Sequence, residues 1–156
     1  MTPAINAAKK AKIDFKVHEY EHDVSALSYG SEAAQKLNIP AGQVFKTLVV
    51  SLDNKNFSVG LVPVSNMLNM KRIAKTGGAK KAVMADRKDV ERLTGYVLGG
   101  VSPLGQKKRL KTVIDSSAEN FSTIYVSAGR RGLEIELSPE NLKKLTNGIF
   151  AEISQD

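Results

Sequence analysis

Two apolar segments rich in β-branched residues, at residues 44–52 and 57–64, constrain the fold more than any other feature of the chain. The four residues between them, Asp53-Asn54-Lys55-Asn56, have side chains that favour tight turns. We therefore expect an antiparallel hairpin. Many other strand-like segments occur, with helices interspersed but without strict strand–helix alternation. This pattern predicts an α+β fold with a mixed sheet or barrel.

The remaining elements follow from capping residues and from the spacing of apolar residues. Helices are expected at residues 4–13, 32–38, 65–75, 87–93 and 140–146, with Ser31 capping the second and Asp86 the fourth. The segment 65–75 is expected as one helix or as a turn followed by a helix. Further strands are expected at residues 15–20, 82–84, 96–98, 112–114, 121–127, 133–137 and 150–153. The length of 156 residues favours a single domain spanning 1–156.

Composition excludes several classes of protein. No apolar run reaches the roughly 18 residues that a membrane-spanning helix needs, so we expect no membrane partner. The first sixteen residues lack the apolar core of a signal peptide, which favours a cytoplasmic location. The chain has no cysteine, and this excludes disulfides, thiolate metal sites and a cysteine nucleophile.

The positive charge is concentrated in one region. The chain has a formal net charge of +7, yet residues 71–111 hold twelve basic residues against three acidic ones. The rest of the chain holds eleven basic and thirteen acidic residues. A regional excess of this kind favours a polyanionic partner, of which nucleic acid is the commonest. The alternative is a lysine-rich surface that keeps the protein soluble.

Familiar catalytic motifs are missing from the sequence. The two histidines, His18 and His22, have acidic neighbours but no distant third ligand, so the pattern favours partly exposed side chains over a metal site. A Gly-x-Ser-x-Gly elbow is absent, and Ser102 is followed by Pro103, which has no N–H to stabilise an oxyanion. The glycine-rich loop at residues 99–105 also lacks the Gly-Lys-Ser/Thr of a P-loop.

Two features could carry chemistry nevertheless. The glycines of the 99–105 loop allow its backbone to approach a ligand closely, although they suit a demanding turn equally well. Lys46 begins an apolar strand, where it either snorkels to solvent or points into a pocket. In a pocket, its ammonium would suit a carboxylate, a phosphate or a developing oxyanion, with the Thr47 hydroxyl at the pocket edge or on the opposite face.

Taken together, these segments resemble the YbaK/EbsC-type Cys-tRNA(Pro) deacylases, relatives of the editing domain inserted in bacterial prolyl-tRNA synthetases. The resemblance covers nearly the whole chain. It rests on Thr2-Pro3-Ala4, Tyr20-Glu21-His22-Asp23, Val44-Phe45-Lys46-Thr47-Leu48, Thr94-Gly95-Tyr96, the segment 99–110 (GGVSPLGQKKRL), Ile124-Tyr125-Val126-Ser127-Ala128-Gly129 and Gly132-Leu133-Glu134-Ile135.

The resemblance implies an activity, a fold and a set of site residues. The implied activity is hydrolysis of cysteine mischarged on proline tRNA, with Cys-tRNA(Cys) as a further substrate. The implied fold is a compact α+β domain around a mixed, mostly antiparallel, barrel-like sheet with surrounding helices. The family lysine falls on Lys46 and its Gly-x-x-x-Pro loop on residues 99–103, so Gly99 and Gly100 are expected catalytic residues. The expected substrate-binding residues are Tyr20, Thr47, Ser102, Pro103, Ser127 and Glu134.

The resemblance also implies a mechanism and partners. The substrate cysteine's own thiol would attack its ester carbonyl, which requires no metal, no cofactor and no protein nucleophile. The acceptor end of tRNA(Pro) would bind the basic region, at Lys71, Arg72, Lys80, Lys81, Lys107, Lys108 and Arg109. Prolyl-tRNA synthetase would read the tRNA in a ternary complex. The alternatives are a non-catalytic binder of tRNA or aminoacyl-tRNA, and an editing enzyme for another residue such as alanine.

Overall fold

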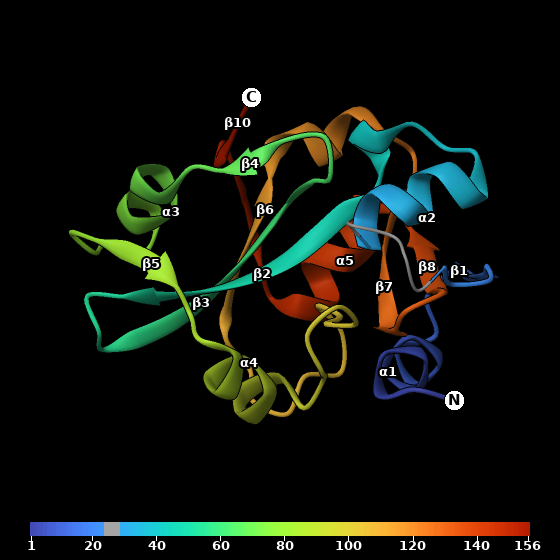
Figure 1. Ribbon diagram of the computed structural model, residues 1–156, viewed down its shortest axis with the longest axis horizontal. Helices are drawn as coiled ribbons and strands as arrows, with labels where there is room; N and C mark the ends of the chain where they lie inside the picture. Colours follow the sequence, from blue (N-terminus) through green and yellow to red (C-terminus); the bar gives the residue numbers. More distant parts are fainter. Residues whose placement is uncertain (24–28) are drawn as a thin grey trace.

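The expected hairpin is the central element of the computed structural model, which describes residues 1–23 and 29–156. Strand β2 (Phe45–Leu52) pairs antiparallel with β3 (Asn56–Pro63) along its whole length. Asp53 and Asn54, in the turn, have φ angles of 53° and 55°, a conformation that these two residue types tolerate. Strands β5 (Ala82–Met84), β6 (Lys111–Asp115) and β9 (Ile149–Ala151) extend the hairpin to a five-stranded sheet in the order β5-β2-β3-β6-β9 (Figure 1).

A second sheet lies beside this one. Strands β1 (Phe15–Glu19), β8 (Leu133–Leu137) and β7 (Ile124–Arg130) form an antiparallel sheet in the order β1-β8-β7, and β4 (Met67–Leu68) pairs with β10 (Ser154–Gln155). Only β3–β6 and β6–β9 are parallel among the described strands, so the expected mixed, mostly antiparallel arrangement is confirmed. Within the described residues, one parallel bridge from Val44 to Tyr125 joins the two larger sheets, in place of a continuous barrel ladder.

In the described residues, five α-helices surround the sheets: α1 (Pro3–Ala11), α2 (Tyr29–Leu37), α3 (Met70–Thr76), α4 (Arg87–Thr94) and α5 (Pro139–Thr146). Short 3-10 segments occupy Ala41–Gln43 and Ser116–Asn120. The expected cap at Asp86 is confirmed, because its side chain accepts a hydrogen bond from the Asp89 N–H. The cap expected at Ser31 is wrong, because α2 begins at Tyr29 and Ser31 lies in its first turn.

Three expected strands differ from the structure. Residues 96–98 form a turn in place of a strand, because the Gly100 N–H donates to the Val97 carbonyl and Gly99 has a φ of 95°. Strand β7 begins at Ile124, three residues after the expected start at Phe121. The last expected strand, residues 150–153, is replaced by β9 and the separate short strand β10.

The hairpin sheet is buried on both faces. One face, which includes Phe45 and Val49, shares the main core with the inner face of the three-stranded sheet. The other, which includes Val50 and Leu52, packs under α3. A third, smaller cluster joins Val44 to α2 and to Tyr125 on the outer face of the three-stranded sheet. In the part of the chain that the structure describes, no helix is long and apolar enough to span a membrane.

Candidate active site

A cavity of about 490 Å³ lies where the first half of β2 passes the outer face of the three-stranded sheet. Strands β2 and β7 run in the same direction from the Val44–Tyr125 bridge, and no further pairing between them occurs in the described residues. The space between these unpaired edges is the cavity. Its walls come from residues 44–49 of β2, from Ser127 and Glu134 of the neighbouring sheet, and from the loop that contains Gly99.

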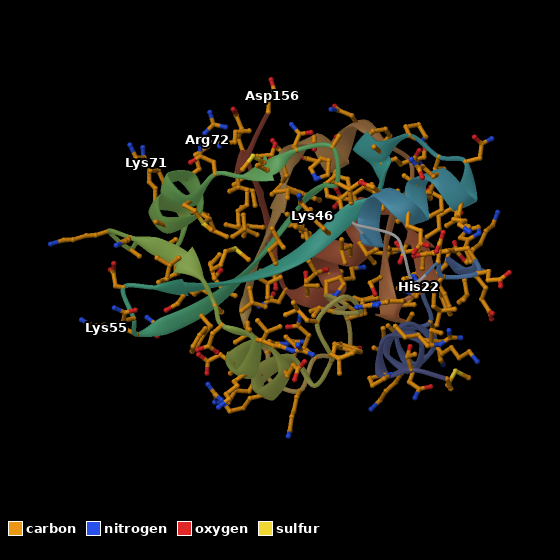
Figure 2. The ribbon with its side chains drawn as sticks, in the orientation of Figure 1. His22, Lys46, Lys55, Lys71, Arg72 and Asp156 are labelled. Atoms are coloured by element: carbon orange, nitrogen blue, oxygen red, sulfur yellow. The ribbon has the colours of Figure 1, made fainter. Side chains whose placement is uncertain are left out.

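Lys46 lines this cavity, half-buried near the start of β2 (Figure 2). Burial lowers the pKa of its ammonium, because a cation loses solvation away from water. Within residues 1–23 and 29–156, Lys46 forms no ion pair. The charge is therefore left available to a ligand in the cavity.

Thr47 lines the same space. Its hydroxyl is buried and has no hydrogen-bond partner among the described residues. The direction of its backbone groups follows from the strand ladder. The Val64 N–H donates to the Val44 carbonyl, and in an antiparallel ladder the alternate residues direct their N–H and C=O away from the partner strand. The amide groups of Thr47 therefore face the unpaired edge of β2, on the cavity side.

Glu134 is the acidic group of the cavity. It is 7% exposed and lies opposite Ser127 in the β7–β8 register, so the two side chains share a face. Burial raises the pKa of its carboxyl to about 8. In the described part of the chain, Glu134 forms no ion pair with Lys46 or with any other residue.

Tyr20 and Ser127 complete the polar lining. Burial raises the pKa of Tyr20 to about 12, and the nearby Glu134 carboxyl contributes in the same direction. The Ser127 hydroxyl accepts a hydrogen bond from the Gly129 N–H at 3.2 Å. No histidine is among the cavity-lining residues that the structure describes, so neither hydroxyl belongs to a Ser–His pair there.

The glycine-rich loop contributes only part of what the sequence suggests. Gly99 and Val101 line the cavity. Gly100 lies outside the lining, and its N–H is taken by the Val97 carbonyl at 3.0 Å. A Cβ at Gly100 would lie 2.9 Å from the Arg130 Cα, so this glycine allows the loop to pack against the β7–β8 turn.

Ser102 and Pro103 lie away from this cavity. Ser102 is fully buried, and its hydroxyl accepts a hydrogen bond from the Leu104 N–H at 3.2 Å. Pro103 lines a second cavity on the other side of the loop. The structure thus gathers Tyr20, Lys46, Thr47, Gly99, Ser127 and Glu134 in one place, while Gly100, Ser102 and Pro103 support or adjoin the loop.

Sequence reasoning missed several residues of this cavity. Arg130 and Arg131 line it from the β7–β8 turn, Arg87 from the start of α4, and Met84 and Leu98 supply apolar walls. The signal for the first pair was the segment Gly129-Arg130-Arg131-Gly132, a tight turn with two cations between the strands that carry Ser127 and Glu134. Arg131 also lies 3.3 Å from the His22 ring.

The basic residues are spread over several elements. Lys71 and Arg72 lie on α3, at the far end of the molecule from His22 (Figure 2). Arg72 is held by the Ser154 carbonyl at 2.6 Å and by the Glu152 carboxylate at 3.3 Å. Lys80 and Lys81 precede β5, where their backbone N–H groups bond to Asp53. Lys107, Lys108 and Arg109 follow the glycine-rich loop and are exposed.

The two histidines have separate carboxylate partners. His18 contacts Glu136 at 2.8 Å and His22 contacts Glu32 at 2.7 Å. Among the residues that the structure describes, no group of three histidine, aspartate or glutamate side chains could hold a metal ion.

Comparison with known proteins identifies the family. The model of the aminoacyl-tRNA editing domain matches residues 25–145. EbsC of Enterococcus faecalis, provisionally named a Cys-tRNA(Pro)/Cys-tRNA(Cys) deacylase, is 41% identical over 153 residues, which cover 98% of this chain and 93% of EbsC. A proline–tRNA ligase of Trichlorobacter lovleyi is 30% identical over 98 residues, which cover 63% of this chain and 17% of the ligase.

The fold agrees with this relationship. A crystal structure provisionally described as a trans-editing enzyme for prolyl tRNA synthetase matches with a TM-score of 0.87 at 24% identity, covering 99% of this chain and 96% of the other. A second solved structure, of the hypothetical protein APE2540, has the same TM-score at 23% identity. The chain belongs to the aminoacyl-tRNA editing domain family.

Proposed function

We propose that this chain, an aminoacyl-tRNA deacylase by family, removes cysteine from mischarged proline tRNA, and that Cys-tRNA(Cys) is a further substrate. The name of EbsC, at 41% identity over almost the whole chain, supports the choice of amino acid. The relation to part of a proline–tRNA ligase supports the choice of tRNA. The observation that carries the proposal is the convergence of Lys46, Thr47 and the buried Glu134 on one cavity.

Glu134, Lys46 and the loop N–H groups each have a partner in an aminoacyl ester. The Glu134 carboxylate would bind the α-ammonium of the amino acid, and the incoming positive charge would lower the raised pKa of this carboxyl. Lys46 would bind the terminal phosphates or stabilise the oxyanion that forms at the ester carbonyl. The N–H groups of Gly99 and Val101 replace that of Gly100 as the proposed backbone donors, because the Gly100 N–H is already bonded to Val97.

The ester itself supplies the nucleophile in the proposed reaction. The substrate thiol loses its proton, and its sulfur bonds to the carbonyl carbon of the same aminoacyl group. The bond from that carbon to the ribose oxygen then breaks, and the ribose oxygen takes up a proton. Cysteine leaves as a cyclic thiolactone, which water opens to free cysteine. The protein's contribution is orientation of the thiol and stabilisation of the oxyanion.

Recognition of the tRNA as a whole is proposed to need prolyl-tRNA synthetase in a ternary complex. Phosphate contacts by the basic residues position an RNA without reading its sequence. Two alternatives stay open to assay. One is a non-catalytic binder of aminoacyl-tRNA, which would leave Cys-tRNA(Pro) intact. The other is an editing enzyme for alanine, which would cleave Ala-tRNA(Pro) faster than Cys-tRNA(Pro).

The decisive experiment compares substrates that differ by one atom. Single-turnover deacylation of Cys-tRNA(Pro) and Ser-tRNA(Pro) should show fast loss of cysteine and little loss of serine, because a hydroxyl is a far poorer nucleophile than a thiol. Binding should change little, so the loss should appear in turnover. Ala-tRNA(Pro) and Pro-tRNA(Pro) serve as controls for specificity. Equal rates for cysteine and serine, with no thiolactone to trap, would contradict attack by the substrate thiol.

A further inference from the structure

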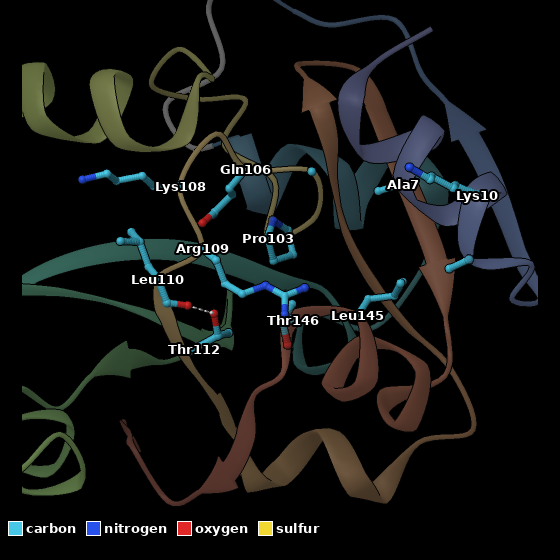
Figure 3. A pocket seen from close by; sticks show the side chains of 12 residues that line it. Ala7, Lys10, Pro103, Gln106, Lys108, Arg109, Leu110, Thr112, Leu145 and Thr146 are labelled. Carbon is cyan, nitrogen blue, oxygen red and sulfur yellow. Dashed lines mark hydrogen bonds between the residues drawn. The ribbon is translucent and has the colours of Figure 1, made fainter.

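A second cavity, of about 320 Å³, lies on the opposite side of the glycine-rich loop from the candidate active site. It is enclosed by α1, by the loop from Pro103 to Leu110 and by the end of α5 (Figure 3). Much of its wall is apolar, contributed by Ala7, Ala11, Pro103, Leu110 and Leu145. Its volume is at the lower end of the range of small-molecule sites. A group about the size of a nucleobase would fit in the cavity and lie against its apolar wall.

The charged groups of this cavity all have one sign. Lys10, Lys108 and Arg109 line it, and no acidic residue is among its described lining. None of these three cations forms an ion pair within residues 1–23 and 29–156. In Figure 3 the Arg109 side chain extends across the cavity toward Leu145 and Thr146, and Lys10 approaches from α1. The Lys108 ammonium points away from the centre.

The neutral polar groups of the cavity are already bonded within the protein. The Thr112 hydroxyl donates to the Leu110 carbonyl at 3.1 Å, and the Thr146 hydroxyl donates to the Leu142 carbonyl at 2.8 Å. The Gln106 side-chain amide donates to the Ser102 carbonyl at 2.9 Å. The cations are therefore the groups available to a ligand, and the ligand that they fit is an anion attached to an apolar or planar body.

The two cavities share one wall. Gly99 and Val101 line the candidate active site, and Pro103 and Gly105 line the second cavity. The loop between them is held firmly, because the Tyr96 hydroxyl donates to the Leu104 carbonyl and a Cβ at Gly105 would lie 2.5 Å from the Pro3 carbonyl oxygen. A molecule that occupies both cavities would therefore have its two parts fixed relative to each other.

From these observations we propose that the second cavity binds one unpaired nucleotide of the same tRNA whose 3′ ester enters the active site. The phosphate lies against Arg109 and Lys10, and the base lies against the apolar wall. The nucleotide must be unpaired, because a base in a double helix stays stacked between its neighbours and cannot enter a cavity. The proposal rests on the proposed function, since it takes the substrate to be an RNA with a free 3′ end.

The test measures the affinity for two uncharged acceptor-arm RNA hairpins, one with an unpaired 3′ end and one blunt. Arg109→Gln should weaken binding of the first hairpin about tenfold and change binding of the blunt hairpin little. Ala7→Leu should give the same selective loss, because it fills the cavity without changing the charge. The matched control is Lys55→Gln, an equal loss of charge in the β2–β3 turn, which should leave both affinities unchanged.

The outcomes separate this proposal from the proposed function. Equal weakening of both hairpins by Arg109→Gln would reduce Arg109 to a general phosphate contact and overturn the proposal. So would unchanged binding in both cavity variants, or an equal effect of Lys55→Gln. Because the hairpins carry no amino acid, these results do not depend on deacylation. The cysteine and serine assay tests the reaction whatever the hairpins show.

Discussion

At the scale of single residues, the same cavity shifts two titratable groups in opposite directions. Burial lowers the pKa of Lys46 and raises the pKa of Glu134 to about 8. Both shifts disfavour the charged form of the group, as desolvation requires. A ligand that carries both a cation and an anion would favour the charged form of both. An aminoacyl-tRNA end, with its α-ammonium and its phosphates, is such a ligand.

Replacing Lys46 tests this reasoning. Lys46→Ala should lower kcat/KM for deacylation by about a hundredfold or more, the usual cost of losing one group that stabilises an oxyanion. The fold should be retained, because the side chain is half-buried at the beginning of a strand and forms no ion pair in the described residues. Lys55→Ala, at an exposed turn, is the control and should keep full activity. Unchanged turnover in Lys46→Ala would make Lys46 a surface residue.

The two glutamates of β8 should affect stability with opposite sign. A carboxyl with a raised pKa binds its proton more tightly when folded, so the stability that Glu134 contributes is present below its ordinary pKa of 4.5 and is lost as pH rises toward about 8. Glu134→Gln should therefore stabilise the protein by about 4 kcal/mol near pH 8, measured by urea unfolding.

Glu136, two residues later, is the matched control. Its pKa is lowered although burial acts in the opposite direction, because it accepts hydrogen bonds from Thr123 and lies beside His18. Its stabilising contribution is present above its ordinary pKa and is lost as pH falls. Glu136→Gln should therefore destabilise the protein at neutral pH. A loss of stability in both variants near pH 8 would contradict the raised pKa of Glu134.

At the scale of elements, the glycine-rich loop is positioned by contact with α1. Thr2 caps α1 and its hydroxyl also donates to the Ala128 carbonyl, so one residue ties the helix start to the end of β7. Gly105 has a φ of 65° and packs against the backbone of Pro3. The loop can therefore pack here only because residue 105 is a glycine, which has no Cβ to clash with Pro3.

Gly105→Ala should be far more disruptive than an equivalent change elsewhere. Its Cβ would meet the Pro3 carbonyl oxygen at 2.5 Å in addition to the strained φ, which should cost about 3 kcal/mol or more. Gly78→Ala is the control, because Gly78 has a φ of 71° but nothing lies within 4 Å of the added Cβ. It should cost about 1 kcal/mol. Thermal unfolding of both variants measures the difference, and equal losses would contradict backbone contact as the cause.

At the scale of the whole molecule, the chain has a net charge of +7, so its affinity for tRNA should depend on the salt concentration. Affinity for tRNA should fall steeply as salt is added, because each phosphate contact releases counterions. Reversing Lys107, Lys108 and Arg109 to glutamate should weaken binding and flatten this dependence. Reversing Lys16, Lys36 and Lys55 changes the net charge equally and is the control. Unaltered binding in the variant of residues 107–109 would assign the basic excess to solubility, and equal losses in the two triple variants would contradict a local binding site there.

Elements with local signals could be predicted from sequence. The β2–β3 hairpin follows from two β-branched segments around an Asp-Asn turn, and α4 follows from the cap at Asp86. These signals act within a few residues, so no distant part of the chain needs to be known. The strand predicted at residues 96–98 is absent from the structure for the opposite reason. Its apolar residues suggest a strand, but no neighbouring strand pairs with it in the described residues.

The site required both kinds of information. Motif resemblance was enough to name Lys46, Thr47, Ser127 and Glu134, four of the residues that line the cavity. The burial of these residues, and the pKa shifts that follow from it, were decided by the tertiary structure. The alternation Leu133-Glu134-Ile135-Glu136-Leu137 predicts two exposed glutamates on one face of a strand. Glu134 is buried nevertheless, because Tyr20, Gly30 of α2 and the first half of β2 surround the same cavity. Desolvation depends on which elements pack together rather than on which residues are adjacent in the chain.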